Sequence, residues 1–203
     1  MKTQKKSLGL TLIEVLIALS IVLIVTAISI PSLLEVLPKV RVKNAANMIK
    51  TDILWARMKA VSSNNNYIMT FGEPGPVFTN NSYAIYNDSD NDFGTVHVEP
   101  AELVKNISIP VMEKGIVFGY VPGLKTTNNS DDLEDDPVKF TTGGASDPRW
   151  FALKPNGLPS LSGTIYIIPE KDIANNRTDR MRAIQVLNSG RIKIWEYQNN
   201  LWK

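Results

Sequence analysis

An uninterrupted apolar segment near the N-terminus constrains this chain more than any other feature. Residues 10–30 are twenty-one in number and contain a single charged side chain, Glu14. As an α-helix with a rise of 1.5 Å per residue, such a segment spans roughly 30 Å, the thickness of the hydrocarbon core of a bilayer. The preceding sequence, MKTQKKSLG, has three lysines and no acid. The positive-inside rule therefore predicts a cytoplasmic N-terminus and an exported remainder.

Two ordinary kinds of membrane-targeting segment fit the pattern poorly. A secretory signal peptide has a shorter apolar region, about 7–15 residues, followed by a small-x-small cleavage site. Here the apolar run is longer, and the residues that close it, 28–31, are Ile-Ser-Ile-Pro. A simple signal anchor fits the length but leaves Glu14 unexplained, since an acid within an apolar membrane helix costs a few kcal/mol.

The residues around Gly9 resemble the class III signal of type IV prepilins and type II secretion pseudopilins. The resemblance rests on the glycine, the basic leader and the later acid, within Ser7-Leu8-Gly9-Leu10-Thr11-Leu12-Ile13-Glu14-Val15-Leu16-Ile17-Ala18-Leu19. It implies that a prepilin peptidase cleaves after Gly9 on the cytoplasmic side, that Leu10 becomes the methylated N-terminus, and that the apolar helix is kept. Many members have Phe where this chain has Leu10.

The same resemblance implies a role in assembly for Glu14. Inside a bundle of apolar helices, a carboxylate needs a partner or becomes neutral. In the family, this acid pairs with the N-terminal amine of a neighbouring subunit, which sets the axial register of the fibre. The alternative is a solvated acid at the lipid interface.

The sequence predicts four regions. They are a leader peptide at 1–9, a transmembrane and assembly helix at 10–30, an amphipathic continuation of that helix at 31–63, and a β-rich periplasmic domain at 64–203. In the third region apolar residues recur at three- and four-residue steps, as on one face of a helix. Pro31 and Pro38 either kink the helix or end the membrane span.

The remainder of the chain has a sequence pattern typical of β-strands. Short runs rich in β-branched and aromatic residues alternate with turn residues. The runs expected to form strands are 67–71, 83–86, 107–111, 116–121, 138–141, 150–153, 164–168, 183–187 and 192–197. Asn188-Ser189-Gly190 is expected to form a hairpin turn, and Thr126–Asp136, with five acids, a solvated loop. The predicted fold class is α+β, a long N-terminal helix packed on an antiparallel β-sheet domain.

The order of elements resembles the GspH/FimT branch of minor pilins and pseudopilins. The cues are the turn at residues 188–192, the Phe151…Pro155-Asn156-Gly157 turn, and the acidic stretch at residues 88–92. The resemblance implies a minor subunit, assembled with other pilins through its N-terminal helix into a type II secretion pseudopilus or a type IV pilus. The subunit would start in the bacterial inner membrane, with its C-terminal domain in the periplasm.

A DNA-binding minor pilin acting in natural transformation is the alternative function. Gly190-Arg191-Ile192-Lys193 resembles the basic turn that some FimT-like pilins use to bind DNA, and period-two alternation puts Arg191 and Lys193 on one side of a strand. However, the family motif has arginine where this chain has Lys193, and lysine lacks the forked guanidinium. The net charge of +2 gives no global attraction to nucleic acid. An ordinary solvated strand face is the competing interpretation.

Three alternating acids suggest a possible calcium loop. Asp88, Asp90 and Asp92 have the spacing of oxygen ligands, and Glu99 is the twelfth residue counted from Asp88. Phe93 stands where an EF-hand needs glycine, so a polar hairpin loop is the competing interpretation. No other cofactor is expected.

The residue types argue against an enzyme. The chain has no cysteine and one histidine, His97, which has no evident acid–base partner in the sequence. We therefore expect a structural subunit and no catalytic site.

Overall fold

The computed structural model describes residues 11–72, 81–90, 100–127, 136–141 and 149–203. Its contacts divide the chain into two compact units, Met1–Pro38 and Lys39–Lys203. One long helix, α1 (Leu12–Ser63), contributes to both units. The helix assignment runs through Pro31 and Pro38, so neither proline ends the helix.

The first unit contributes an apolar and exposed stretch of α1. Residues Leu12–Ile30 have a mean hydropathy of 2.7, and none of this stretch is buried within the chain. By length and composition it can cross a membrane. An apolar helix without a protein core around it requires another apolar environment.

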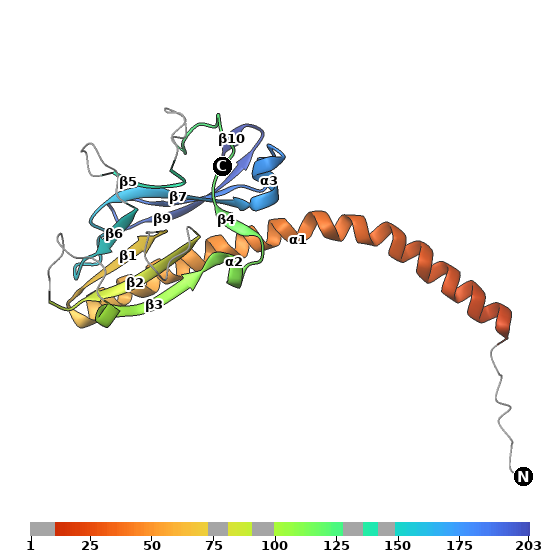
Figure 1. The fold of residues 1–203 in the computed structure, drawn as a ribbon, viewed down its shortest axis with the longest axis horizontal. Helices are drawn as coiled ribbons and strands as arrows, with labels where there is room; N and C mark the ends of the chain where they lie inside the picture. Colours follow the sequence, from red (N-terminus) through yellow and green to blue (C-terminus); the bar gives the residue numbers. More distant parts are fainter. Residues whose placement is uncertain (1–10, 73–80, 91–99, 128–135, 142–148) are drawn as a thin grey trace, which may run out of the picture. The chain divides into compact units, whose positions relative to one another are not determined.

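The second unit contains two antiparallel sheets (Figure 1). The first has the order β3-β2-β1-β6 and consists of β1 (Asn66–Phe71), β2 (Ser82–Asp88), β3 (Leu103–Ser108) and β6 (Trp150–Leu153). The second has the order β10-β9-β8-β7-β4, with β5 also paired to β7. Its strands are β4 (Ile116–Phe118), β5 (Val138–Thr141), β7 (Ser162–Pro169), β8 (Arg182–Val186), β9 (Ile192–Gln198) and β10 (Leu201–Trp202). The predicted α+β class, with an N-terminal helix followed by antiparallel strands, is confirmed.

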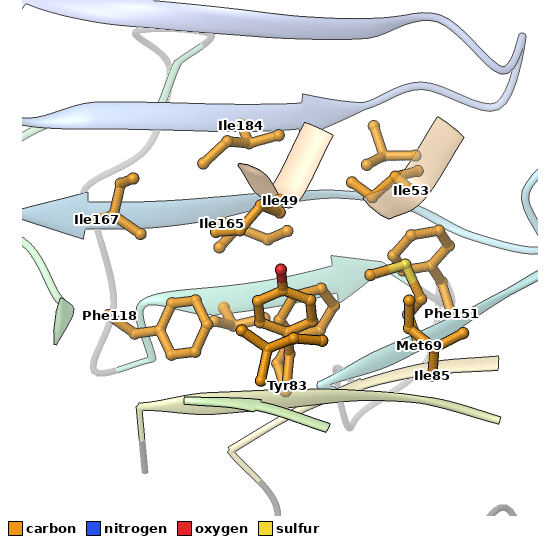
Figure 2. Packing of buried hydrophobic residues seen from close by; sticks show 14 of the residues in the cluster. Ile49, Ile53, Met69, Tyr83, Ile85, Phe118, Phe151, Ile165, Ile167 and Ile184 are labelled. Carbon is orange, nitrogen blue, oxygen red and sulfur yellow. The ribbon is translucent and has the colours of Figure 1, made fainter. Parts of the chain in front are cut away.

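The main core lies between the two sheets and the C-terminal part of α1 (Figure 2). The helix supplies a buried stripe at three- and four-residue steps: Val42, Ala45, Ala46, Ile49, Ile53, Ala56 and Ala60. Small alanines lie on either side of the two larger isoleucines, so small and large side chains together fill the space facing the sheets. The first sheet contributes Phe71, Phe151 and Tyr83, and the second contributes Ile165, Ile167 and Ile184.

A buried polar contact fixes the helix to the first sheet. The Tyr83 hydroxyl donates to Asp52 Oδ2 at 2.5 Å, and Lys105 forms an ion pair with the same carboxylate. Asp52 is 5% exposed, so its charge requires both partners. Burial and the contact with Asp52 raise the pKa of Tyr83 far above its usual value. The Tyr83 hydroxyl therefore stays protonated and remains a donor to Asp52.

Some predicted elements differ from the structure. The expected strand at 107–111 ends at Ser108, because Pro110 lies in the short helix α2 (Ile109–Met112) and cannot donate to a strand ladder. The strand instead begins earlier, at Leu103, after the 3₁₀ helix η1 (Pro100–Glu102). The short helix α3 (Glu170–Ala174) and strand β10 were not predicted from the sequence. Thr127, expected in a solvated loop, is buried at 6% exposure, and residues 128–135 of that loop lie outside the described part of the chain.

Candidate functional site

The N-terminal end of α1 is closed by a reciprocal pair of side chains. Thr11 donates from its backbone N–H and from Oγ1 to Glu14 Oε2, at 2.9 and 2.8 Å. The backbone N–H of Glu14 in turn approaches Thr11 Oγ1 at 3.3 Å. This is a capping box, in which residues three positions apart satisfy backbone donors that the first helical turn leaves free.

The polar side chains within the apolar stretch are satisfied inside the helix. Ser20, Thr26 and Ser29 donate their hydroxyls to backbone carbonyls three or four residues earlier, at 2.8–2.9 Å. Such bonds remove the cost of placing a hydroxyl in hydrocarbon. Glu14 is therefore the one charged group that a membrane or a helix bundle must accommodate along Leu12–Ile30.

The structure does not describe the two expected processing residues. Gly9 and Leu10 are outside the described residues, so their assignment rests on the sequence. Glu14 and Thr11 are the described members of the same motif, and both are exposed within the chain.

A protein-family model matches the leader and the apolar part of the chain. The model described as the prokaryotic N-terminal methylation motif matches residues 4–30. Residues 4–30 are an N-terminal methylation motif. The resemblance that the residues around Gly9 indicated is thereby confirmed for this part of the chain.

Solved structures of two minor subunits resemble part of this chain. The minor pseudopilin EpsH of the type 2 secretion system of Vibrio cholerae is 10% identical, with a TM-score of 0.45, over 77% of this chain and 97% of that one. The type IV minor pilin FimU of Pseudomonas aeruginosa is 14% identical, with a TM-score of 0.43, over 75% of this chain and 90% of that one. Likenesses at these values do not transfer function. A comparison with curated proteins gives no match.

Outside the methylation motif, the turn before β9 is held by a side chain of α1. Arg57 Nη1 donates to the Gly190 carbonyl at 3.1 Å. A Cβ at Gly190 would lie 3.1 Å from Arg57 Nη2, and a Cβ at Gly157 would lie 3.2 Å from Arg57 Nε. The guanidinium therefore lies against both glycine turns that the sequence singled out. Arg57 itself was missed, because its position on the helix gives no sign of these distant contacts.

The two candidate DNA-contacting residues differ in their surroundings. Arg191 is exposed, just before β9. Lys193 lies over the Trp195 ring, its Nζ 3.0 Å from the ring centroid, in a cation–π contact. Trp195 Nε1 donates to Gln185 Oε1 at 3.0 Å, which fixes the ring beneath the lysine. Lys193 is thus already engaged within its own sheet.

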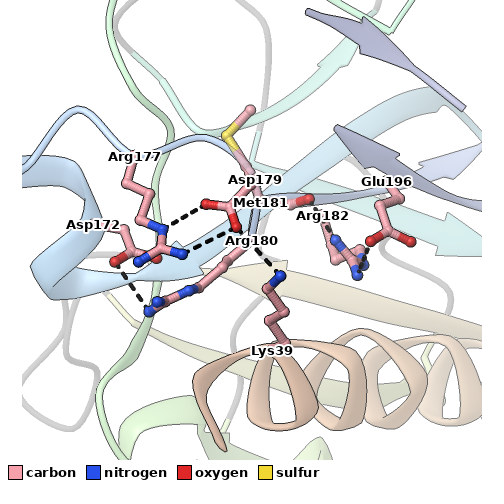
Figure 3. A network of polar contacts seen from close by, with 8 residues as sticks. All are labelled: Lys39, Asp172, Arg177, Asp179, Arg180, Met181, Arg182 and Glu196. Atoms are coloured by element: carbon pink, nitrogen blue, oxygen red, sulfur yellow. Dashed lines mark hydrogen bonds and ion pairs between the residues drawn. The ribbon is translucent and has the colours of Figure 1, made fainter. Parts of the chain in front are cut away.

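The arginines near this turn in sequence are paired with acids (Figure 3). The pairs are Arg177–Asp179 at 2.6 Å, Arg180–Asp172 at 3.4 Å and Arg182–Glu196 at 2.5 Å. Lys39 of α1 also reaches Asp179, at 3.4 Å. Such pairing neutralises the positive charge that phosphate binding would need.

The two aspartates of this network are shifted in opposite directions. The hydrogen bond from Arg177, assisted by Lys39, lowers the pKa of Asp179. Burial raises the pKa of Asp172, and the attraction of Arg180 only partly offsets it. Both aspartates belong to an ion-pair network at the start of β8.

Part of the predicted acidic loop forms a cluster. One carboxylate oxygen from each of Asp88, Asp90 and Glu102 lies within 4.8 Å of the others. The sequence pattern did not single out Glu102, the third described member of this cluster. Asp92, Glu99 and His97 lie outside the described residues.

Proposed function

We propose that this chain is a prepilin-type subunit, a minor pilin or pseudopilin that assembles through its N-terminal helix. The observation that carries the proposal is the coincidence of the methylation motif at residues 4–30 with an apolar helix that the rest of the chain leaves wholly exposed. A removed cationic leader and a retained apolar helix account for both features. The fibre would be a type II secretion pseudopilus or a type IV pilus.

The mechanism follows from the physical chemistry of the helix. Before assembly the apolar stretch resides in the inner membrane, and the three leader lysines keep the N-terminus in the cytoplasm. Cleavage after Gly9 by a prepilin peptidase creates a new amine at Leu10. Glu14 of one subunit then pairs with this amine on a neighbouring pilin, and the apolar helices bundle away from water. The second unit, Lys39–Lys203, makes the contacts that decide which subunits the chain assembles with.

The experiment that tests this proposal reads the mature N-terminus. Co-expression with a prepilin peptidase should yield a chain that begins at Leu10 and carries one added methyl group, measured by intact mass and N-terminal peptide mass spectrometry. Gly9→Ala should leave full-length precursor in the membrane fraction, because it adds a side chain immediately before the bond to be cleaved.

Gly115→Ala provides the matched control for the loss of a glycine far from the leader, and it should be processed normally. A native chain that begins at Met1 in the presence of the peptidase, or one that has lost the whole apolar helix, would contradict the proposal. Normal processing of Gly9→Ala would refute the assigned cleavage site.

The DNA-binding alternative is not favoured. Arg177, Arg180 and Arg182 are engaged with acids, and Lys193 is engaged with Trp195. Arg191 alone does not make the extended basic surface that phosphate binding needs.

A further inference from the structure

A carboxylate cluster at the end of β2 gathers residues from two separate elements. Asp88 is the last residue of β2, Asp90 follows two residues later, and Glu102 ends η1. The pairing of β2 with β3 shifts register between Ile85 and Tyr86, so that Tyr86 lies opposite Leu103. The antiparallel pairing of these strands places Glu102, the residue before Leu103, near the end of β2.

The central member of the cluster has a buried oxygen without a partner. Asp88 is 1% exposed, and its Oδ1 finds no hydrogen-bond donor among the described residues. Its other oxygen, Oδ2, accepts from Asn66 Nδ2 at 3.1 Å. A buried carboxylate oxygen without a donor is costly, and two neighbouring acids add like-charge repulsion. A bound cation removes both costs.

Hydrogen bonds hold the Glu102 side chain in place within the cluster. The backbone N–H and the hydroxyl of Ser89 both donate to Glu102 Oε1, at 2.6 and 2.8 Å. Without these bonds the glutamate side chain would extend into solvent. With them it stays beside the two aspartates. The cluster is therefore pre-organised by hydrogen bonds rather than formed by chance overlap of flexible side chains.

The chemistry of the ligands favours calcium. The three ligands are all carboxylate oxygens. Such ligands bind hard cations such as calcium in preference to softer transition metals. Calcium bonds at 2.3–2.6 Å place oxygens on opposite sides of the ion about 5 Å apart, and magnesium requires a tighter octahedron. Oxygens within 4.8 Å of one another fit around one calcium ion. We propose that Asp88, Asp90 and Glu102 form a calcium site that ties the end of β2 to the residue preceding β3.

The test measures calcium binding to the full chain in detergent micelles, after removal of divalent ions with a chelator. Isothermal titration with CaCl₂ should give one site per chain, and saturating calcium should raise the thermal unfolding midpoint by roughly 5–10 °C. MgCl₂ at equal ionic strength should give a clearly smaller shift. An equal shift with magnesium would overturn the assignment to calcium.

The variant Asp88→Asn makes the test specific. It should abolish the calcium-dependent rise, yet without calcium it should unfold at the same temperature as the wild type or higher, because it removes a buried unpaired charge. Glu102→Gln should also abolish or strongly weaken binding. Glu170→Gln, an exposed acid on α3, makes the same charge change away from the cluster and should retain the full calcium response.

Two results would overturn the site. One is a wild type with no calcium response while its unfolding remains cooperative. The other is a response that survives in both Asp88→Asn and Glu102→Gln. The proposal is independent of processing and assembly, so a chain that fails the N-terminal cleavage test can still bind calcium, and the reverse.

Discussion

Glu14 has two chemical properties that its proposed role could use, an acceptor oxygen and a negative charge. The oxygen closes a capping box with Thr11. The charge is what pairing with the amine of a neighbouring subunit requires. The sequence pointed to the charge, because a lone acid in an apolar helix is costly. The cap is evident only once the helix is known to begin at Leu12. Thr11 is then the N-cap residue and Glu14 the third helical residue, as in a Ser/Thr-x-x-Glu capping box.

Two substitutions separate these properties. Glu14→Gln keeps an acceptor suited to the capping box but removes the charge, whereas Glu14→Ala removes both. If the charge drives assembly, both variants should be cleaved normally and both should enter sheared fibres at least tenfold less than the wild type, since breaking a buried ion pair costs about 3–5 kcal/mol. Immunoblots of the fibre and membrane fractions measure this. Wild-type incorporation of Glu14→Gln, with loss only for Glu14→Ala, would instead assign the role to the cap.

The acidic cluster illustrates how far single residues could be predicted. Alternation of acids after a strand singled out Asp88 and Asp90. The sequence indicated Asp92 as the third acid and Glu99 as the twelfth position of the loop, and both lie outside the described residues. It did not single out Glu102, which η1 and the pairing of β2 with β3 place beside Asp88 and Asp90. The pairing of two strands that are distant in sequence sets this neighbourhood, so no local pattern reports it.

At the scale of elements, the strands with continuous apolar or alternating patterns were predictable and the short helices were not. The expected strands at 67–71, 138–141, 150–153 and 192–197 agree with β1, β5, β6 and β9 within one residue. β3 begins with Leu103, Val104, Lys105 and Asn106, all exposed at the edge of its sheet, so it lacks the buried pattern that identifies a strand. The helices α2 and α3 are too short to show a period.

The β8–β9 turn depends on a residue of α1, and this dependence can be measured. Gly190 has a φ of +78° and a Cβ there would approach Arg57 Nη2 at 3.1 Å. Gly115 has a φ of +76° with nothing within 4 Å of an added Cβ. Gly115→Ala should therefore lose only the cost of the left-handed backbone, about 1–2 kcal/mol. Gly190→Ala should lose more, because Arg57 must also move away from the Gly190 carbonyl.

Chemical denaturation of both variants in the wild-type and Arg57→Ala backgrounds tests this coupling. In the Arg57→Ala background the extra cost of Gly190→Ala should disappear, whereas the cost of Gly115→Ala should stay the same. Equal costs for the two glycines in the wild type would show that the guanidinium yields freely and does not hold the turn.

At the scale of the whole molecule, the end of the apolar segment and the start of the folded unit lie at different residues. The apolar run ends at Ile30, but contacts place the start of the second unit at Lys39, and its buried stripe begins at Val42. The boundary depends on which turn of a continuous helix first meets the sheets. That position is set by packing, which the hydropathy of the helix does not report.

Residues 39–203 should therefore fold without the apolar segment. Every member of the main core lies at Val42 or beyond, so removal of residues 1–38 deletes no buried side chain of that core. We expect this fragment to be soluble without detergent and to unfold cooperatively, with a midpoint within a few degrees of that of the full chain in mild detergent. Circular dichroism melts and size-exclusion chromatography check both statements.

A shorter fragment, residues 54–203, supplies the control. It lacks Val42, Ile49 and Ile53, which are fully buried, together with Asp52, the partner of Tyr83 and Lys105. Burial of each of the three aliphatic side chains contributes about 1.5–3 kcal/mol, and their sum approaches the whole stability of an ordinary domain, about 5–15 kcal/mol. This fragment should aggregate or remain unfolded. If it folded as well as residues 39–203, the helix would be an attachment to the sheets rather than a part of their core.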